Sequence, residues 1–100
     1  MTTDSISTAA AAPKHAHPVD LEVVREYGRK YARQHSVISM NLASDYILGS
    51  GSSEEYQELF AEFERGTEDE VRDGTITAEA QQHQLTAFAT VLNGRRSRLG

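Results

Sequence analysis

The stretch VISMNLASDYIL, residues 37–48, decides the fold class, because its pattern fits either a strand or a helix. Ile38, Met40 and Leu42 alternate with polar residues, as they would in a half-buried strand. Ile38, Leu42 and Tyr46 also recur at every fourth position, which is typical of one face of a helix. Every neighbouring segment has helical spacing, so a single strand here would have no partner. We therefore predict a largely buried central helix over 37–48.

A helix is also predicted on the N-terminal side of this stretch, over 19–34. Its apolar residues are spaced by three and four positions and would share one face: Leu21, Val24, Tyr27 and Tyr31. Gly28 lies inside this helix and weakens it by roughly 1 kcal/mol relative to alanine. Either another helix packs closely against Gly28, or the helix depends on a partner for its stability.

The glycine-rich stretch LGSGSSEEY, residues 48–56, follows the central helix and could be a phosphate-binding loop or a turn. Its glycines can adopt the positive φ that ends a helix. Ser52 lies three residues before Glu55, which is the spacing of a capping box that begins the next helix. Glu54 and Glu55 would repel a phosphate there, and no lysine follows the glycines as in a P-loop. We interpret the stretch as a turn.

Three further helices are predicted downstream, over 53–65, 68–73 and 78–93. The first has aromatic and leucine residues at helical spacing and is expected to stop at Gly66. A second capping box, Thr67 with Glu70, begins the short helix, and the pair Asp73-Gly74 closes it. Thr77 is expected to cap the last helix, which is expected to stop at Gly94.

The predicted fold class is all-α, a small helical bundle of four main helices plus one short helix. Residues 1–18 contain Ile6 as their one large aliphatic residue, so we predict a disordered N-terminal tail there. The helical domain is assigned to 19–94 and a short basic C-terminal tail to 95–100. A domain of this size buries only about 60% of the surface that its unfolded chain exposes. We therefore expect a partner or a second copy to complete the core.

Composition narrows the class of protein further. One hundred residues make at most one domain, and the hydrophobic share, 38%, is near that of a globular chain. The absence of cysteine excludes disulfides, thiolate nucleophiles and cysteine-bound zinc. The longest apolar stretch is shorter than the ~20 residues that span a bilayer, and the N-terminus lacks the basic start and apolar core of a signal peptide. We expect a cytoplasmic protein with no membrane association.

Two stripes of opposite charge stand out within the net charge of −5. Three arginines in the first helix are spaced by four, and so are three glutamates in the third helix. Like charges at this spacing destabilise a helix by roughly 0.2–0.5 kcal/mol per pair. We hypothesise that the two stripes face one another, within a monomer or between subunits. The candidate interaction residues are Arg25, Arg29, Arg33, Glu54, Glu58 and Glu62.

Motifs for catalysis or metal binding are weak. DGTIT at 73–77 resembles part of an EF-hand loop, but aligning its glycine with the motif leaves Val71 and Ala80 at two ligand positions. No nucleophile elbow or zinc-protease motif occurs. We expect no enzymatic activity, cofactor, metal or small-molecule substrate. His15 and His17 lie in the predicted tail and would bind a metal only incidentally, and His35 and His83 are single, with no carboxylate at a reliable ligand spacing. We therefore expect the histidines to be structural or exposed.

The function favoured by these features is that of a small non-catalytic protein-protein interaction protein, an accessory or assembly subunit or a regulatory adaptor. Its partner would be another protein or further copies of itself, contacted by the first helix and the acidic third helix. One alternative is an acidic nucleic-acid mimic, in which carboxylates of 54–73 occupy a nucleic-acid-binding groove. Another is nucleic-acid binding by Arg25, Arg29 and Arg33, which the negative net charge makes less favourable.

Overall fold

The computed structural model describes residues 15–99 and contains four helices in that range. They are α2 (Pro18–Gln34), α3 (Val37–Leu48), α4 (Ser53–Arg72) and α5 (Ala78–Leu99). The described part of the chain contains no strand, so the all-α prediction is confirmed. The predicted disordered tail lies mostly outside the described residues.

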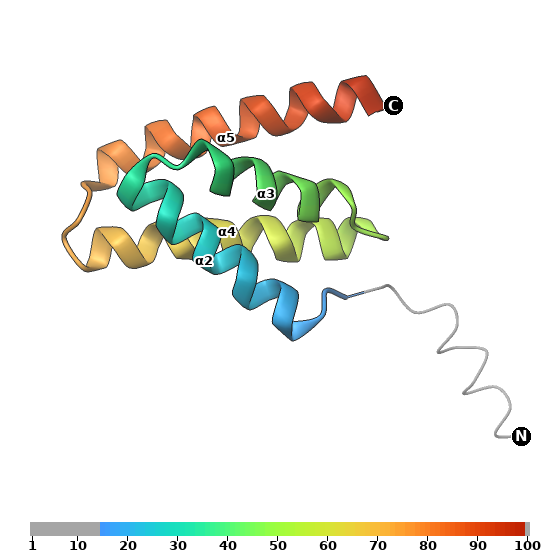
Figure 1. Cartoon of the computed structure of the whole chain (residues 1–100), viewed down its shortest axis with the longest axis horizontal. Helices are drawn as coiled ribbons and strands as arrows, with labels where there is room; N and C mark the ends of the chain where they lie inside the picture. Colours follow the sequence, from blue (N-terminus) through green and yellow to red (C-terminus); the bar gives the residue numbers. More distant parts are fainter. Residues whose placement is uncertain (1–14, 100) are drawn as a thin grey trace, which may run out of the picture.

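The helices form a small bundle (Figure 1). α2 and α3 make an antiparallel hairpin, α4 runs in the same sense as α2, and α5 returns antiparallel to α4. The hairpin turn is made by His35, which has a left-handed backbone (φ 54°) and donates its N–H to the carbonyl of Tyr31. Ser36 then begins α3, because its side chain accepts a hydrogen bond from the N–H of Ser39. The segment 37–48 is therefore the helix predicted from the sequence.

The turn between α3 and α4 is a capping box, as predicted. Ser52 accepts from the N–H of Glu55 at 3.1 Å, and the Glu55 carboxylate accepts from the N–H of Gly51 at 2.6 Å. The positive φ expected of the glycines in this turn is wrong, since Gly49 ends α3 with φ −85°. Among the described glycines the positive φ belongs to Gly74, which follows α4.

α4 is one helix of 20 residues, so the predicted stop at Gly66 is wrong. The predicted short helix over 68–73 is the last part of α4. Thr67 does not cap a helix, since its hydroxyl donates to the carbonyl of Glu64 one turn earlier. Gly66 stays helical because its missing side chain is used in packing against α2, as described below.

α5 continues past Asn93 to Leu99, so the predicted stop at Gly94 is also wrong. Thr77 caps its N-terminus, as predicted, by accepting from the N–H of Ala80 at 3.0 Å. The basic residues after Gly94 extend the helix, because positive side chains in the last turn interact favourably with the helix dipole. Arg95 also holds α5 to α3 through an ion pair with Asp45.

The hydrophobic core lies where the four helices meet. Phe63 of α4 stacks on Phe88 of α5 with ring centroids 3.9 Å apart, and Tyr31 of α2 lies 5.7 Å from Phe63. The largest fully buried apolar side chains come from all four helices: Val24, Ile47, Leu59, Phe63, Phe88 and Leu92. No described helix is both long enough and apolar enough to cross a bilayer.

The prediction that α3 is largely buried is only half right. The face with small residues points inward, with Ala43, Ser44 and Ile47 fully buried. The small side chains of Ala43 and Ser44 let α3 approach its neighbours closely. The stripe that identified the helix in the sequence points outward instead, with Ile38 73% and Leu42 39% exposed.

Candidate interaction site

The charged contacts of the protein are organised by a close crossing of α2 and α4. Gly28 and Gly66 face each other there. A Cβ added to Gly28 would lie 2.3 Å from the carbonyl oxygen of Phe63, and one added to Gly66 would lie 2.2 Å from that of Arg25. Real Cβ atoms do not approach backbone this closely, so both positions require glycine. The close approach expected as one explanation for Gly28 is confirmed.

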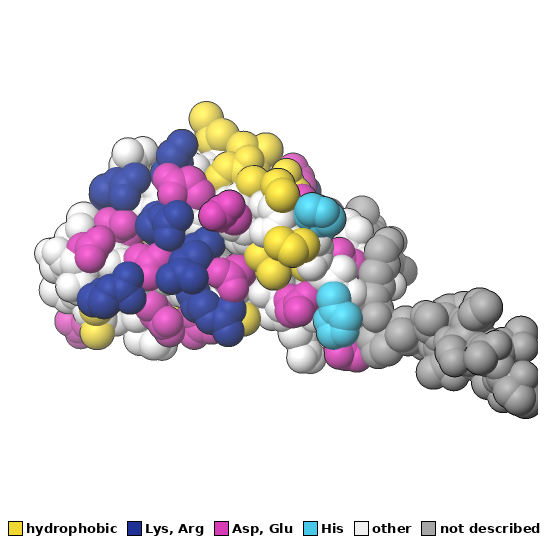
Figure 2. All heavy atoms as spheres, turned by 90° about the horizontal axis from the view of Figure 1, so that it is seen from below, with side chains coloured by type: hydrophobic (Ala, Val, Ile, Leu, Met, Phe, Trp, Pro, Cys, Tyr) yellow, Lys and Arg dark blue, Asp and Glu magenta, His cyan; other side chains and the backbone are white. Residues whose placement is uncertain are grey.

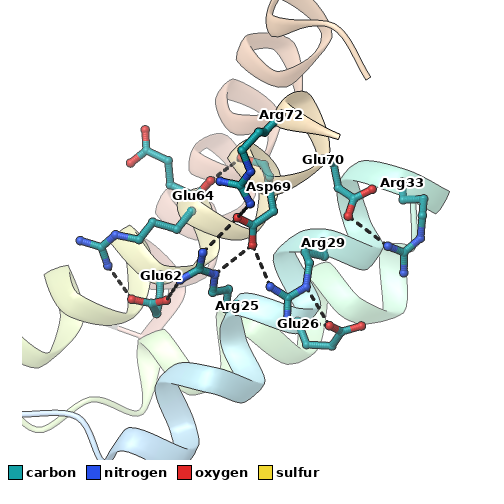
Figure 3. Close-up of polar contacts among 11 residues, drawn as sticks. Arg25, Glu26, Arg29, Arg33, Glu62, Glu64, Asp69, Glu70 and Arg72 are labelled. Atoms are coloured by element: carbon teal, nitrogen blue, oxygen red, sulfur yellow. Dashed lines mark hydrogen bonds and ion pairs between the residues drawn. The ribbon is translucent and has the colours of Figure 1, made fainter. Parts of the chain in front are cut away.

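The crossing brings arginines of α2 against Asp69 of α4 (Figure 3). Arg25 donates two hydrogen bonds to the carboxylate, from Nε at 2.9 Å and from Nη2 at 3.0 Å. Arg29 donates a third at 2.7 Å, and Arg72 of α4 itself donates a fourth at 2.6 Å. We call Arg25, Arg29, Asp69 and Arg72 the Asp69 cluster.

Asp69 is buried, with 6% of its side chain exposed, yet it is fully paired. The hydrogen bond from Arg25 lowers the pKa of its carboxyl far below the ordinary value, with further lowering by Arg29 and Arg72. Burial alone would raise that pKa, so the three guanidinium groups outweigh the cost of removing the carboxylate from water. The carboxylate is therefore ionised throughout the physiological range and ties the two helices together.

Further ion pairs extend the Asp69 cluster along the crossing. Arg29 also bonds to Glu26 at 2.9 Å on its own helix. Arg33 reaches Glu70 at 3.0 Å, and Glu70 is itself only 3% exposed. Arg25 lies 3.5 Å from Glu62. Almost every charge at the crossing thus has an opposite charge within the same chain.

The predicted stripes meet only in part. Of the three predicted glutamates, Glu62 contacts an arginine of α2. Glu58 instead accepts the N–H of Ala16 at 2.8 Å and lies 3.4 Å from His15. Glu54 lines an open groove beside the start of the described chain. The other pairs across the crossing use Asp69 and Glu70, which lie about two turns beyond Glu62 on α4.

Asp69 and Glu70 were missed in the sequence because the predicted stop at Gly66 placed them on another element. A continuous helix over 53–72 puts Glu62, Gly66 and Asp69 on one face at steps of four and three. That spacing, combined with Gly28 in the facing helix, is the signal that could have located the cluster.

A second feature is an apolar band on the outer surface of the α2–α3 hairpin. Each helix contributes three residues spaced by four, and we call these six the apolar band. Of the two end residues, Val19 is 59% exposed and Ile38 is 73% exposed, and Leu42 and Tyr46 are exposed as well. The members are Val19, Val23 and Tyr27 on α2, and Ile38, Leu42 and Tyr46 on α3.

The two halves of the apolar band join at Tyr27 and Tyr46, whose ring centroids are 6.2 Å apart. Because α2 and α3 are antiparallel, Val19 and Ile38 mark opposite ends of the band. Figure 2 shows hydrophobic side chains beside the mass of paired acidic and basic side chains on this side of the molecule. Val37, 59% exposed, adds to the apolar surface near the Ile38 end.

Two concave features on the described part of the chain are open to solvent. The groove beside His15 is lined by acidic side chains, including Glu54 and Glu58. A cleft between α4 and α5 is more apolar, and Arg96 lies over the Tyr56 ring at its edge, 5.0 Å from the centroid. Within residues 15–99, no three histidine or acidic side chains are placed to share a metal ion.

No similar protein indicates a function for this chain. The chain matches no protein-family model, no curated protein and no solved structure.

Proposed function

We propose that this is a non-catalytic protein-protein interaction protein, an accessory or assembly subunit or a small regulatory adaptor, that binds through its apolar band. The observation that supports the proposal best is the exposure of Ile38, at 73%, in line with Leu42 and Tyr46 on one helix face. The cysteine-free sequence fits a reducing compartment, and we propose the cytoplasm as its location.

Burial of this band by a partner would be favourable. Removing apolar surface from water contributes roughly 25 cal/mol per Å². Single exposed hydrophobic residues are common, but contiguous ones mark binding surfaces. Three apolar side chains spaced by four on one helix form a ridge, and such a ridge can pack against a helix of a partner.

The same charges that suggested nucleic-acid functions count against them. A nucleic-acid mimic needs unpaired carboxylates, whereas Glu62, Asp69 and Glu70 bond to arginines of the same chain. Phosphate binding needs available arginines, whereas Arg25 and Arg29 donate to Asp69. Either function would first have to break ion pairs that hold α2 to α4.

The proposal can be tested by photo-cross-linking in the cells that produce the protein. The photoreactive residue benzoylphenylalanine would replace Ile38 in one variant and Gln57, an exposed residue of α4, in the control. We expect position 38 to give a covalent adduct heavier than the single chain and position 57 to give none. An absence of adducts at 38, or equal yields at both positions, would overturn the proposal.

A further inference from the structure

We infer that the partner covering the apolar band is a second copy of this chain, placed about a two-fold axis so that the two bands run antiparallel. Ile38 of each copy then packs against Val19 of the other, and the tyrosine pairs meet at the centre. The inference rests on the proposed function, because it takes the band as the contact surface and names its occupant.

The composition of the band makes it self-complementary. Each half consists of two aliphatic residues and a tyrosine spaced by four, and the halves join at the contact between Tyr27 and Tyr46. When such a band is turned end for end, the order of its aliphatic residues and tyrosines is the same. An isologous interface has this property, since the same patch serves both subunits.

The charges along the edge of the band fit the reversal. Glu22, Glu26 and Lys30 are spaced by four on α2; Glu22 and Glu26 directly precede the band residues Val23 and Tyr27, and Lys30 lies three residues after Tyr27. This edge is acidic at the Val19 end and basic toward the turn. An antiparallel second copy places its Lys30 beside the glutamates of the first. Among the described residues Lys30 and Glu22 make no ion pair within their own chain, so both are available for this contact.

The size of the band sets the strength of the association. Six side chains from each copy are far fewer than the roughly 20–30 residues per side of a standard interface. We therefore expect a dimer that dissociates at micromolar concentrations rather than an obligate one. The helical body has its own buried core, so each copy remains folded when separate.

The first test is the mass of the purified full chain by sedimentation velocity between about 1 and 500 µM, a range that spans micromolar dissociation constants. The wild type should shift from the mass of one chain to that of two as concentration rises. Ile38→Asp should remain at the mass of one chain, and Gln57→Asp should behave as the wild type. Unchanged far-UV circular dichroism in both variants would show that folding is intact.

The second test determines the arrangement of the two copies by disulfide cross-linking. Introduced cysteines can pair only with each other, because the chain contains no native cysteine. Val19→Cys protein and Ile38→Cys protein should form a mixed disulfide dimer when combined under oxidising conditions. Ile38→Cys protein alone should cross-link far less, because the two copies of position 38 lie at opposite ends of the interface. Equal cross-linking of Ile38→Cys with itself would overturn the antiparallel arrangement.

Charge-reversal variants test the contact between Lys30 of one copy and Glu22 of the other, which we call the edge contact. Lys30→Glu should weaken the dimer, and so should Glu22→Lys. A mixture of the two variants should regain it, because each lysine then faces a glutamate again. A failure of the mixture to associate would overturn the edge contact.

The outcomes separate this inference from the proposed function. A wild type that stays at the mass of one chain at 500 µM overturns the second copy. In that case, photo-adducts of Ile38 with a different protein would still support the interaction function. A dimer whose stability is unaffected by Ile38→Asp would overturn the inference by placing the contact elsewhere.

Discussion

Gly28 and Gly66 touch backbone to backbone where α2 crosses α4, with the Cα of Gly66 3.3 Å from the position of a Cβ on Gly28. Neither helix has a side chain between them at this point. The approach brings the guanidinium groups of Arg25 and Arg29 within hydrogen-bond distance of Asp69. The glycine pair and the Asp69 cluster are therefore one structural unit, in which packing sets the distance over which the charges interact.

The first prediction concerns this contact. In Gly66→Ala, the new methyl group would lie 2.2 Å from the carbonyl oxygen of Arg25, so the helices must move apart. Overpacking of this kind costs about 1–3 kcal/mol, and the lengthened bonds to Asp69 add to it. Chemical denaturation should show a lower free energy of unfolding by about 2 kcal/mol or more.

Gly94→Ala is the matched control, because Gly94 also lies inside a helix but has open space around it. A Cβ there would have the guanidinium of Arg98 as its nearest neighbour, at 3.9 Å. Alanine is favoured over glycine inside a helix by roughly 0.5–1 kcal/mol, so this variant should be more stable than the wild type. If both substitutions had the same sign, the close-packing argument would be wrong.

The second prediction is that Asp69→Asn lowers the free energy of unfolding by about 2–4 kcal/mol. The amide keeps the shape of the side chain but leaves three guanidinium groups without a counter-charge. Asp73→Asn is the control, since Asp73 is exposed just beyond α4, and it should change stability by less than about 0.5 kcal/mol. Urea titration at neutral pH would measure both.

The pH dependence of stability should carry the signature of Asp69. Its carboxyl pKa is lower in the folded than in the unfolded protein, so the unfolded chain binds the proton more readily in acid. The stabilisation it provides is complete above the unfolded pKa of about 4 and is lost as pH falls below that value. Asp69→Asn should therefore show a flatter loss of stability than the wild type between about pH 5 and 2, and equal slopes would contradict the assignment.

The sequence was sufficient for the helix spans that depend on periodicity and caps. α3 was predicted with its observed bounds, and Ser52 and Thr77 cap helices as expected. The errors came from Gly66 and Gly94, because a glycine ends a helix or permits a close contact according to what lies opposite it. That neighbour is set by tertiary packing, which one helix does not encode by itself.

Tertiary packing also explains why the sequence located only part of the candidate site. The arginine stripe was visible in the sequence, but its main acceptor, Asp69, could be identified only once α4 was continuous. The apolar stripe of Ile38 and Leu42 was also visible, and it was assigned to the core because apolar periodicity does not state which side of a helix faces inward. Small residues such as Ala43 determine that the opposite face of α3 packs against the core.

A third prediction separates the two faces of α3. Ile47→Ala removes a fully buried side chain and should lower the free energy of unfolding by about 2–4 kcal/mol. Ile38→Ala removes an exposed one and should change the stability of the single chain by less than about 0.5 kcal/mol. Thermal denaturation at low micromolar concentration would measure both without a contribution from association. A large loss in Ile38→Ala under those conditions would contradict the exposed position of the side chain.

The last prediction asks whether the shape of arginine matters at the crossing or only its charge. Arg25 donates two parallel bonds to Asp69 and approaches Glu62 with a third nitrogen, a geometry that a lysine ammonium does not reproduce. Arg25→Lys should therefore lower the free energy of unfolding by about 1–2 kcal/mol although the net charge is unchanged.

Arg65→Lys is the control, because Arg65 is 53% exposed and makes a single bond to Glu62, so it should change stability by less than about 0.5 kcal/mol. High salt should reduce any effect of the control, whereas most of the loss in Arg25→Lys should persist, since Asp69 is shielded from solvent. Equal losses in the two variants would mean that the crossing uses Arg25 only as a positive charge.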